Sequence, residues 1–299
     1  MRDDDLIQLR PEGLYCPPAE LYIDPWKPVA HAVLTHAHAD HARPGSTRYL
    51  AQRDAAPILR HRLGRDLDLT TVAYGEALDV KGVRVSLHPA GHILGSSQVR
   101  LEHEGRVWVV TGDFKRDEDP TCAPFEVVPC DAIITEATFA LPVYRWRPPG
   151  EVIDAILAWW NDCAARGRNA LLCCYALGKA QRVLAGLVGR APRPVLLHGA
   201  MEPLVKVYRD AGVAMVETEP ATDRPKERSS RARWCCALPR PRARPGRGAS
   251  ASARWASRRA GCRCAATAVA RPTTAASRSR TTPTGPRSST RSARAARGG

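Results

Sequence analysis

The chain has 299 residues, enough for one large domain or two ordinary ones, and a formal net charge of +15. Residues 221–299 hold 20 Lys and Arg against 2 Asp and Glu, whereas residues 1–220 hold 25 against 28. The excess of basic residues is therefore confined to the tail. The net charge of the whole chain does not by itself indicate that residues 1–220 bind nucleic acid.

Apolar patterning predicts alternating strands and helices along the first 200 residues. Several polar side chains follow directly after these apolar runs, and ligands of open α/β folds tend to bind at such strand ends. The expected strands are 29–35, 83–87, 98–101, 107–110, 132–135, 170–175 and 195–197, and the expected helices are 51–63, 151–165 and 179–188.

The ends and the cysteines indicate a cytoplasmic protein. The acidic N-terminus lacks the apolar region of a secretory signal, and no stretch reaches the roughly 20 apolar residues of a membrane span. The ten cysteines are irregularly spaced, without a CxxC pair, so we expect reduced thiols rather than a disulfide framework.

Four metal-binding side chains lie within six residues after the first of these strands: His36, His38, Asp40 and His41. Zinc favours imidazole nitrogen and carboxylate oxygen, and two ions about 3.5–4 Å apart can activate water and clamp a phosphodiester. A His-rich tract can also be an accidental metal site. The residues downstream favour a catalytic site instead.

His92 and Asp113 each follow a predicted strand, as the His36–His41 cluster does. Either residue alone could be an ordinary turn residue. Together with the cluster they complete a set for two ions. We expect His36, His38 and His92 to bind one ion, Asp40 and His41 to bind the other, and Asp113 to bridge them.

At these residues the chain resembles the metallo-β-lactamase superfamily, and more narrowly its nucleases with a β-CASP cap. Within that group it is similar to the bacterial ligase-associated DNA exonucleases, relatives of RNA 3′-end-processing nucleases. The resemblance runs from about residue 9 to about residue 220. Its motifs are the segments 13–17, 22–26, 36–45, 89–96, 108–113, 135–139 and 175–182.

The resemblance implies a fold and a domain plan. Residues 1–147 would form the first half of a metallo-β-lactamase αββα sandwich, an α/β fold. Residues 148–220 would form part of a β-CASP cap, and residues 221–299 a disordered tail rich in Arg, Ala and Pro.

The resemblance also implies a DNA exonuclease that holds two divalent ions, zinc with manganese as an alternative. Its partners would be DNA, single-stranded or at ends, and a ligase and helicase of the same repair system, without a membrane. Asp24 would orient a metal ligand from behind the site. Glu136 would lie near the general acid, although a surface carboxylate at a strand end is the alternative. Lys179, Gln181 and Arg182 could face a phosphate, but a solvated helix face is the reading we favour.

The tail departs from the family. A Ser-Asp-His-Ala-Asp motif and a last metal-binding His are expected beyond the cap, yet His198 is the last histidine. Codons for Thr274–Pro286 can be chosen so that a shifted frame reads Arg-Gly-Phe-Ala-Leu-Ser-Asp-His-Ala-Asp-Trp-Pro. Windows 232–240 and 255–264 permit the same shift. We therefore hypothesise a frameshift between about residues 221 and 229, with weak or no nuclease activity and poor solubility as its consequences.

Two other functions stay open. An RNA-processing nuclease or another hydrolase of the superfamily, such as a thioesterase, would use the same metal ligands, although Glu136 and the cap argue against the thioesterase. A non-catalytic protein that binds nucleic acid through its Arg-rich tail would bind in a salt-sensitive and sequence-blind way.

The frameshift hypothesis predicts a single insertion or deletion in the gene between the codons for about residues 221 and 229. Resequencing the gene measures this directly. An unbroken reading frame that encodes the present tail would refute the hypothesis.

Overall fold

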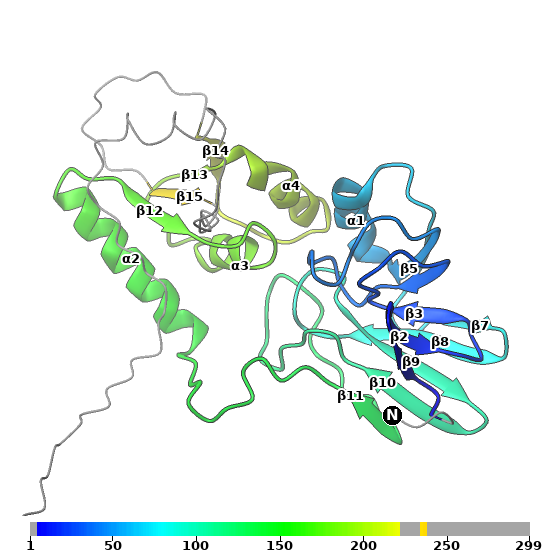
Figure 1. Cartoon of the computed structure of the whole chain (residues 1–299). Helices are drawn as coiled ribbons and strands as arrows, with labels where there is room; N and C mark the ends of the chain where they lie inside the picture. Colours follow the sequence, from blue (N-terminus) through cyan, green and yellow to red (C-terminus); the bar gives the residue numbers. More distant parts are fainter. Residues whose placement is uncertain (1–4, 222–233, 238–299) are drawn as a thin grey trace, which may run out of the picture. The chain divides into compact units, whose positions relative to one another are not determined.

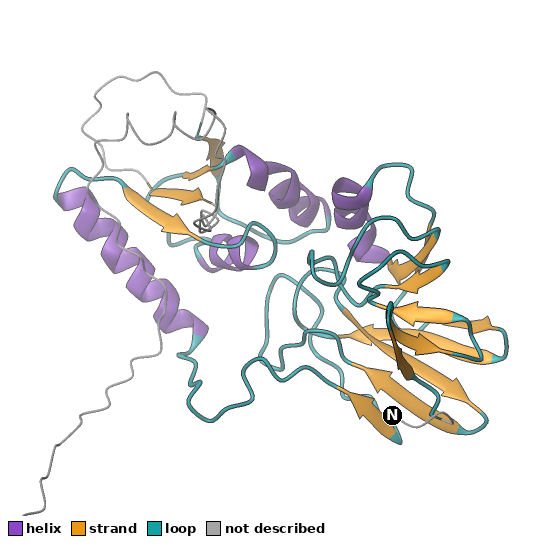
Figure 2. Ribbon diagram, viewed as in Figure 1, coloured by secondary structure: helices purple, strands orange, loops and turns teal. Residues whose placement is uncertain are grey.

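The computed structural model describes residues 5–221 and 234–237 of the chain, and the backbone only for the latter four. Three sheets and four α-helices make up these residues (Figures 1 and 2). No helix in the described ranges is long and apolar enough to span a membrane.

The first sheet has six strands in sequence order. β1 pairs antiparallel with β2 and β2 with β3, and the remaining neighbours are parallel. The strands are β1 (Gln8–Arg10), β2 (Gly13–Cys16), β3 (Leu21–Ile23), β4 (His31–Val33), β5 (Arg48–Gln52) and β6 (Leu69–Val72).

The second sheet has five strands in the order β11-β10-β9-β8-β7. β9 runs antiparallel to both β8 and β10, and β11 is parallel to β10, so the C-terminal ends of β8, β10 and β11 share one edge. The strands are β7 (Ala77–Val80), β8 (Val83–Pro89), β9 (Ser97–His103), β10 (Arg106–Val110) and β11 (Ala132–Ile134).

The two sheets pack face to face around one apolar core. Period-two alternation sends Val83, Val85 and Leu87 of β8 into this core, where they join Val33 and Leu50 from the first sheet. Helix α1 (Ala56–Leu63) follows the short helix η1 (Arg53–Ala55) and covers the opposite face of the first sheet through Ile58 and Leu59. The layers are therefore helix, sheet, sheet, and the predicted α/β class is confirmed.

The later part of the chain forms a parallel four-stranded sheet with helices. Its strands run β12-β15-β13-β14. The elements are α2 (Pro149–Ala165), β12 (Ala170–Cys173), α3 (Lys179–Gly186), β13 (Val195–Leu197), η2 (Gly199–Met201), α4 (Glu202–Asp210), β14 (Thr218–Pro220) and β15 (Trp234–Ala237). Trp160, Leu184 and Met201 are buried in its core.

Strand β15 lies within the predicted tail. Its backbone pairs in parallel with both β12 and β13. Without β15, the facing edges of these two strands would present unpaired N–H and C=O groups. For residues 234–237 the expectation of an unstructured tail is thus corrected. The remaining tail residues, 222–233 and 238–299, lie outside the described part, and the proposed domain boundaries stay predictions.

Most predicted elements are present, with two kinds of difference. The helix expected at 51–63 begins later, because Ala51 and Gln52 continue β5 and pair with β6. Several short elements were not predicted: β1, β2, β3, β5, β6, β7, α4, β14 and β15. The six cysteines within residues 5–221 are not joined by disulfides.

The parallel sheet around β12 offers a stability test with an internal control. Leu172 is 6% exposed and Leu171, on the same strand, is 44% exposed. We expect Leu172→Ala to lower the free energy of unfolding by about 2–5 kcal/mol, because it empties a buried site. Leu171→Ala should cost under about 1 kcal/mol. Urea unfolding measures both, and equal losses would contradict this core assignment.

Candidate metal centre

The candidate site lies where four strands end at one edge of the sandwich. The segment 35–41 follows β4, His92 follows β8, Asp113 follows β10 and Glu136 follows β11. Because β8, β10 and β11 run in the same direction, their following loops meet at that edge. The sheet topology thus gathers side chains that are up to 100 positions apart in the chain.

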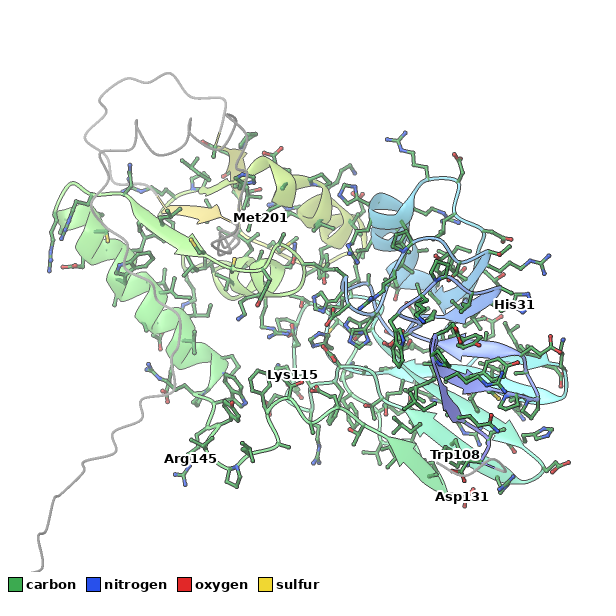
Figure 3. All side chains as sticks on the ribbon, in the orientation of Figure 1. His31, Trp108, Lys115, Asp131, Arg145 and Met201 are labelled. Atoms are coloured by element: carbon green, nitrogen blue, oxygen red, sulfur yellow. The ribbon has the colours of Figure 1, made fainter. Side chains whose placement is uncertain are left out.

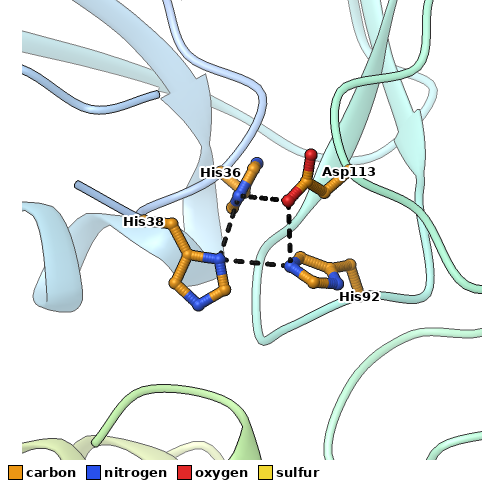
Figure 4. Close-up of side chains that lie close together, drawn as sticks. All are labelled: His36, His38, His92 and Asp113. Atoms are coloured by element: carbon orange, nitrogen blue, oxygen red, sulfur yellow. Dashed lines mark hydrogen bonds and ion pairs between the residues drawn. The ribbon is translucent and has the colours of Figure 1, made fainter. Parts of the chain in front are cut away.

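Three imidazoles and a carboxylate converge on one point (Figure 4). Nδ1 of His38 lies 3.1 Å from Nε2 of His36 and 3.1 Å from Nε2 of His92. Oδ2 of Asp113 lies 3.8 Å from Nε2 of His36 and 3.7 Å from Nε2 of His92. One potential ligand atom from each residue falls within 4.8 Å of all the others.

Hydrogen bonds behind the rings determine which nitrogens carry protons. The Thr35 hydroxyl donates to Oδ2 of Asp24 at 2.5 Å, so it can only accept from Nδ1–H of His36, 3.0 Å away. Nε2 of His38 is 3.3 Å from the carbonyl oxygen of Leu177, which can only accept. Nε2 of neutral His36 and Nδ1 of neutral His38 therefore both present lone pairs to the cluster.

In these tautomers, which are assigned from the hydrogen-bond partners, the two lone pairs face each other at 3.1 Å without a proton between them. Protonating a ring would relieve the repulsion, but burial lowers the pKa of His36 well below its usual range and also lowers that of His38. A divalent cation fits this donor set. Zinc–nitrogen bonds of about 2.0–2.1 Å place tetrahedral ligands about 3.3 Å apart, close to the observed spacing.

The other two histidines of the site differ in ionisation: His92 is neutral, whereas His41 is protonated between two carboxylates. Burial and the neighbouring His38 lower the pKa of His92 to about 4, which keeps it neutral, as a ligand must be. Burial opposes the charged form of His41, but hydrogen bonds to Asp113 and Asp24 outweigh it and raise its pKa to about 10. The hydrogen bond from His41 in turn lowers the pKa of Asp113.

A second, looser group lies on the other side of Asp113. Its Oδ1 is 3.3 Å from Nε2 of His41, which is 3.9 Å from Oδ2 of Asp40. The Asp40 side chain is 73% exposed. Asp113 thus stands between the two groups, as a bridging ligand would, while the roles of Asp40 and His41 as ligands stay predictions.

Asp24 lies directly behind both groups. Its Oδ2 accepts from Nδ1–H of His41 at 2.7 Å and from the Thr35 hydroxyl, and its Oδ1 accepts from the Thr35 backbone N–H at 2.8 Å. One carboxylate therefore orients His41 directly and His36 through Thr35. The role of Asp24 in orienting a metal ligand stays a prediction, and these contacts are compatible with it.

Glu136 is half-buried beside Asp113. Its two oxygens lie 3.4 Å from the backbone N of Phe114 and 3.1 Å from that of Thr138, both oriented to donate. These contacts hold the carboxylate at the end of β11. The negative charge of Glu136 acts to raise the pKa of His92, but burial and His38 outweigh it. Its predicted part in catalysis is not tested by this placement.

The helix residues predicted as phosphate contacts have separate surroundings. Lys179 is exposed, and its Nζ lies 5.5 Å from the centre of the Tyr175 ring. Gln181 is buried, and its amide binds the backbone of Gly178 and Ala176.

Arg182 is half-buried and pairs with Asp119. The favoured interpretation as a solvated helix face is therefore wrong for Gln181 and Arg182, because both side chains turn into the fold.

Sequence reasoning missed three contributors: Thr35, the Leu177 carbonyl and the Asp119–Arg182 pair. Thr35 precedes His36 directly, so a search for hydroxyls beside ligands could have found it. The other two depend on contacts between segments more than 60 residues apart, for which the sequence carries no local signal.

No protein-family profile matches the chain. A protein of Opitutus terrae named "Probable DNA ligase" is 32% identical over 204 residues, 68% of this chain and 20% of that protein. "Cleavage and polyadenylation specificity factor 73" of Drosophila melanogaster is 33% identical over 118 residues, 39% of this chain and 17% of that protein. The chain thus spans about a fifth of the length of these relatives.

Among solved structures, a protein of unknown function from Enterococcus faecalis V583 has a TM-score of 0.49 and 12% identity. The match covers 70% of this chain and 58% of that one.

The fold is a two-sheet sandwich with a candidate metal site at one edge, and the relatives support the predicted resemblance to the metallo-β-lactamase superfamily. The relatives confirm the predicted resemblance to its β-CASP nucleases and to a bacterial protein linked by its name to DNA ligase. A third relative, "Endoribonuclease YSH1" of Eremothecium gossypii, is 30% identical over 118 residues, 39% of this chain and 15% of that protein.

The backbone before Asp113 offers a test of how the site is built. Gly112 has φ +55°, and a Cβ there would lie 2.5 Å from Oγ1 of Thr35. Gly105 has φ +76° with open space around it. Gly105→Ala should cost only the left-handed backbone penalty, about 1–2 kcal/mol. Gly112→Ala should cost about 1–3 kcal/mol more, because it also displaces Thr35. Urea unfolding of both variants measures this, and equal costs would show that Thr35 can move freely.

Proposed function

We propose that the chain is a metal-dependent phosphodiester hydrolase, specifically a DNA exonuclease of a ligase-associated repair system, and that it is impaired in its present sequence. The observation that carries the proposal is the pair of lone pairs that His36 and His38 direct at each other at 3.1 Å. Burial opposes protonation of either ring, so a divalent cation is the occupant that suits them.

Different residues of the site would serve different steps of hydrolysis. His36, His38, His92 and Asp113 would hold one ion, and Asp113, Asp40 and His41 a second, with zinc first and manganese as the alternative. Such ions polarise a phosphodiester and make water a nucleophile at neutral pH. Asp40 is exposed enough for its carboxylate to accept a hydrogen bond from the attacking water. Glu136 would add a further carboxylate near the leaving group.

The nature of the substrate is inferred from the relatives. Of the three relatives described above, the one that matches over 204 residues is named a DNA ligase, and the two that match over 118 residues are named for polyadenylation and endoribonuclease functions. This supports DNA as the substrate, with a ligase and a helicase of the same repair system as partners in the cytoplasm. RNA processing is the runner-up, because the same ligand set serves both polymers.

Tyr175 and Lys179 are the proposed contacts for the strand being degraded. The Tyr175 side chain is 66% exposed, and Leu177, between these two residues, contacts His38 through its carbonyl. An exposed aromatic ring beside a lysine suits stacking of a base and pairing with a phosphate. Arg182 is less suited to this role, because its guanidinium is engaged with Asp119.

The impairment follows from the absence of a histidine after His198. The family supplies a proton to the leaving oxygen from a histidine beyond the cap, and general acid catalysis contributes about 10²–10⁴-fold to rate. The part of the chain where that histidine is expected lies outside the described residues.

Metal analysis and a nuclease assay test the proposal. We expect the purified chain to bind divalent metal and His38→Ala to lose most of it. His103→Ala removes a histidine at the turn between β9 and β10, the end of these strands opposite to the cluster, where its Nδ1 lies 3.1 Å from the Gly82 carbonyl oxygen. This variant should bind metal like wild type. A version with the restored reading frame should cleave DNA about 10²-fold faster or more than the present chain. Equal metal content in wild type and His38→Ala would contradict the proposal.

A further inference from the structure

We propose that Asp119 and Arg182 form a clamp that positions the His92 ligand, an inference that rests on the proposed metal site. Arg182, on α3, pairs through Nε with Oδ2 of Asp119, on the loop after β10. Its Nη2 donates to the carbonyl oxygen of His92 at 3.2 Å. One guanidinium therefore joins a buried carboxylate to the backbone of a candidate ligand.

The Asp119 carboxylate is buried and held in one position by its hydrogen bonds. Its side chain is 1% exposed, and Oδ1 accepts from both the backbone N–H and the hydroxyl of Thr121, at 3.0 and 2.6 Å. Lys115, labelled in Figure 3, holds the same turn by donating to the carbonyl oxygens of Asp117 and Glu118. A buried carboxylate with these partners has little freedom to move, so it fixes the guanidinium.

The loop that carries His92 is held on its two sides by different groups. The Ser96 hydroxyl accepts from the backbone N–H groups of His92 and Ile93, at 3.0 and 3.1 Å. Arg182 binds the carbonyl side of the same residue. With both sides of its backbone held, the His92 ring keeps its Nε2 3.1 Å from Nδ1 of His38.

The clamp also affects the orientation of His38, through the segment 176–181 that precedes Arg182. The Gln181 amide accepts from Gly178 N–H and donates to the Ala176 carbonyl, which makes 176–181 one hydrogen-bonded unit. Within this unit the Leu177 carbonyl accepts from Nε2 of His38. Loosening Arg182 would thus disturb the orientation of two ligands, whereas an ordinary structural ion pair would affect stability alone.

The Arg182→Lys variant separates these roles. Lysine keeps a positive charge beside Asp119 but lacks the second nitrogen of the fork that reaches the His92 carbonyl. We expect the variant to fold, with a zinc dissociation constant raised about tenfold or more, as loss of a group that orients ligands typically causes. The cobalt(II)-substituted protein should show a shifted visible spectrum. Competition with a chromophoric chelator measures the affinity, and circular dichroism measures folding.

Arg190→Lys is the matched control. Arg190 also pairs with an aspartate, Asp154, but the pair is exposed and contacts no candidate ligand. Zinc affinity within twofold of wild type is expected for it. Equal affinities and spectra for the two variants would overturn the clamp, and so would failure of Arg182→Lys to fold. A wild-type chain that binds no zinc would instead refute the proposed function, and the clamp with it.

Discussion

The site depends on neutral imidazole rings that the fold packs so closely that their lone pairs face each other. Nε2 of His36 and Nδ1 of His38 approach to 3.1 Å, and the hydrogen-bond partners behind each ring prevent the tautomer change that would separate them. The free energy for this arrangement comes from the sandwich core and from the carboxylate of Asp24. The protein thus holds its ligands in place before an ion arrives, as precise metal sites require.

The sandwich provides that precision through strand direction. β8, β10 and β11 point the same way within one sheet, so three loops deliver His92, Asp113 and Glu136 to one edge. The first sheet adds the segment after β4, and the face-to-face core fixes the two sheets against each other. Helix α3 then supplies contacts from a distant part of the chain: the Leu177 carbonyl to His38 and the Arg182 guanidinium to His92.

The sequence predicted the elements whose pattern is strong and local. β8 alternates Val83, Val85 and Leu87 with polar residues, and α2 has an apolar stripe that includes Ile153 and Trp160. It did not reveal β1, β2 or β3, because none of these strands lies in an apolar run as long as the runs 29–35 and 170–175 that indicated β4 and β12. The helix boundary at Ala51 was wrong because pairing of β5 with β6 outweighed local helix preference.

The sequence by itself determined the chemistry of the site, since four metal-binding side chains fall within the six residues 36–41 and two more follow predicted strands. It also located the basic charge in the tail. Only the tertiary structure decided which nitrogen of each ring faces the cluster, that Asp113 stands between two groups, and that Arg182 turns inward to Asp119. These features depend on hydrogen bonds between segments distant in the chain, whose partners become neighbours only when the sheets and helices pack.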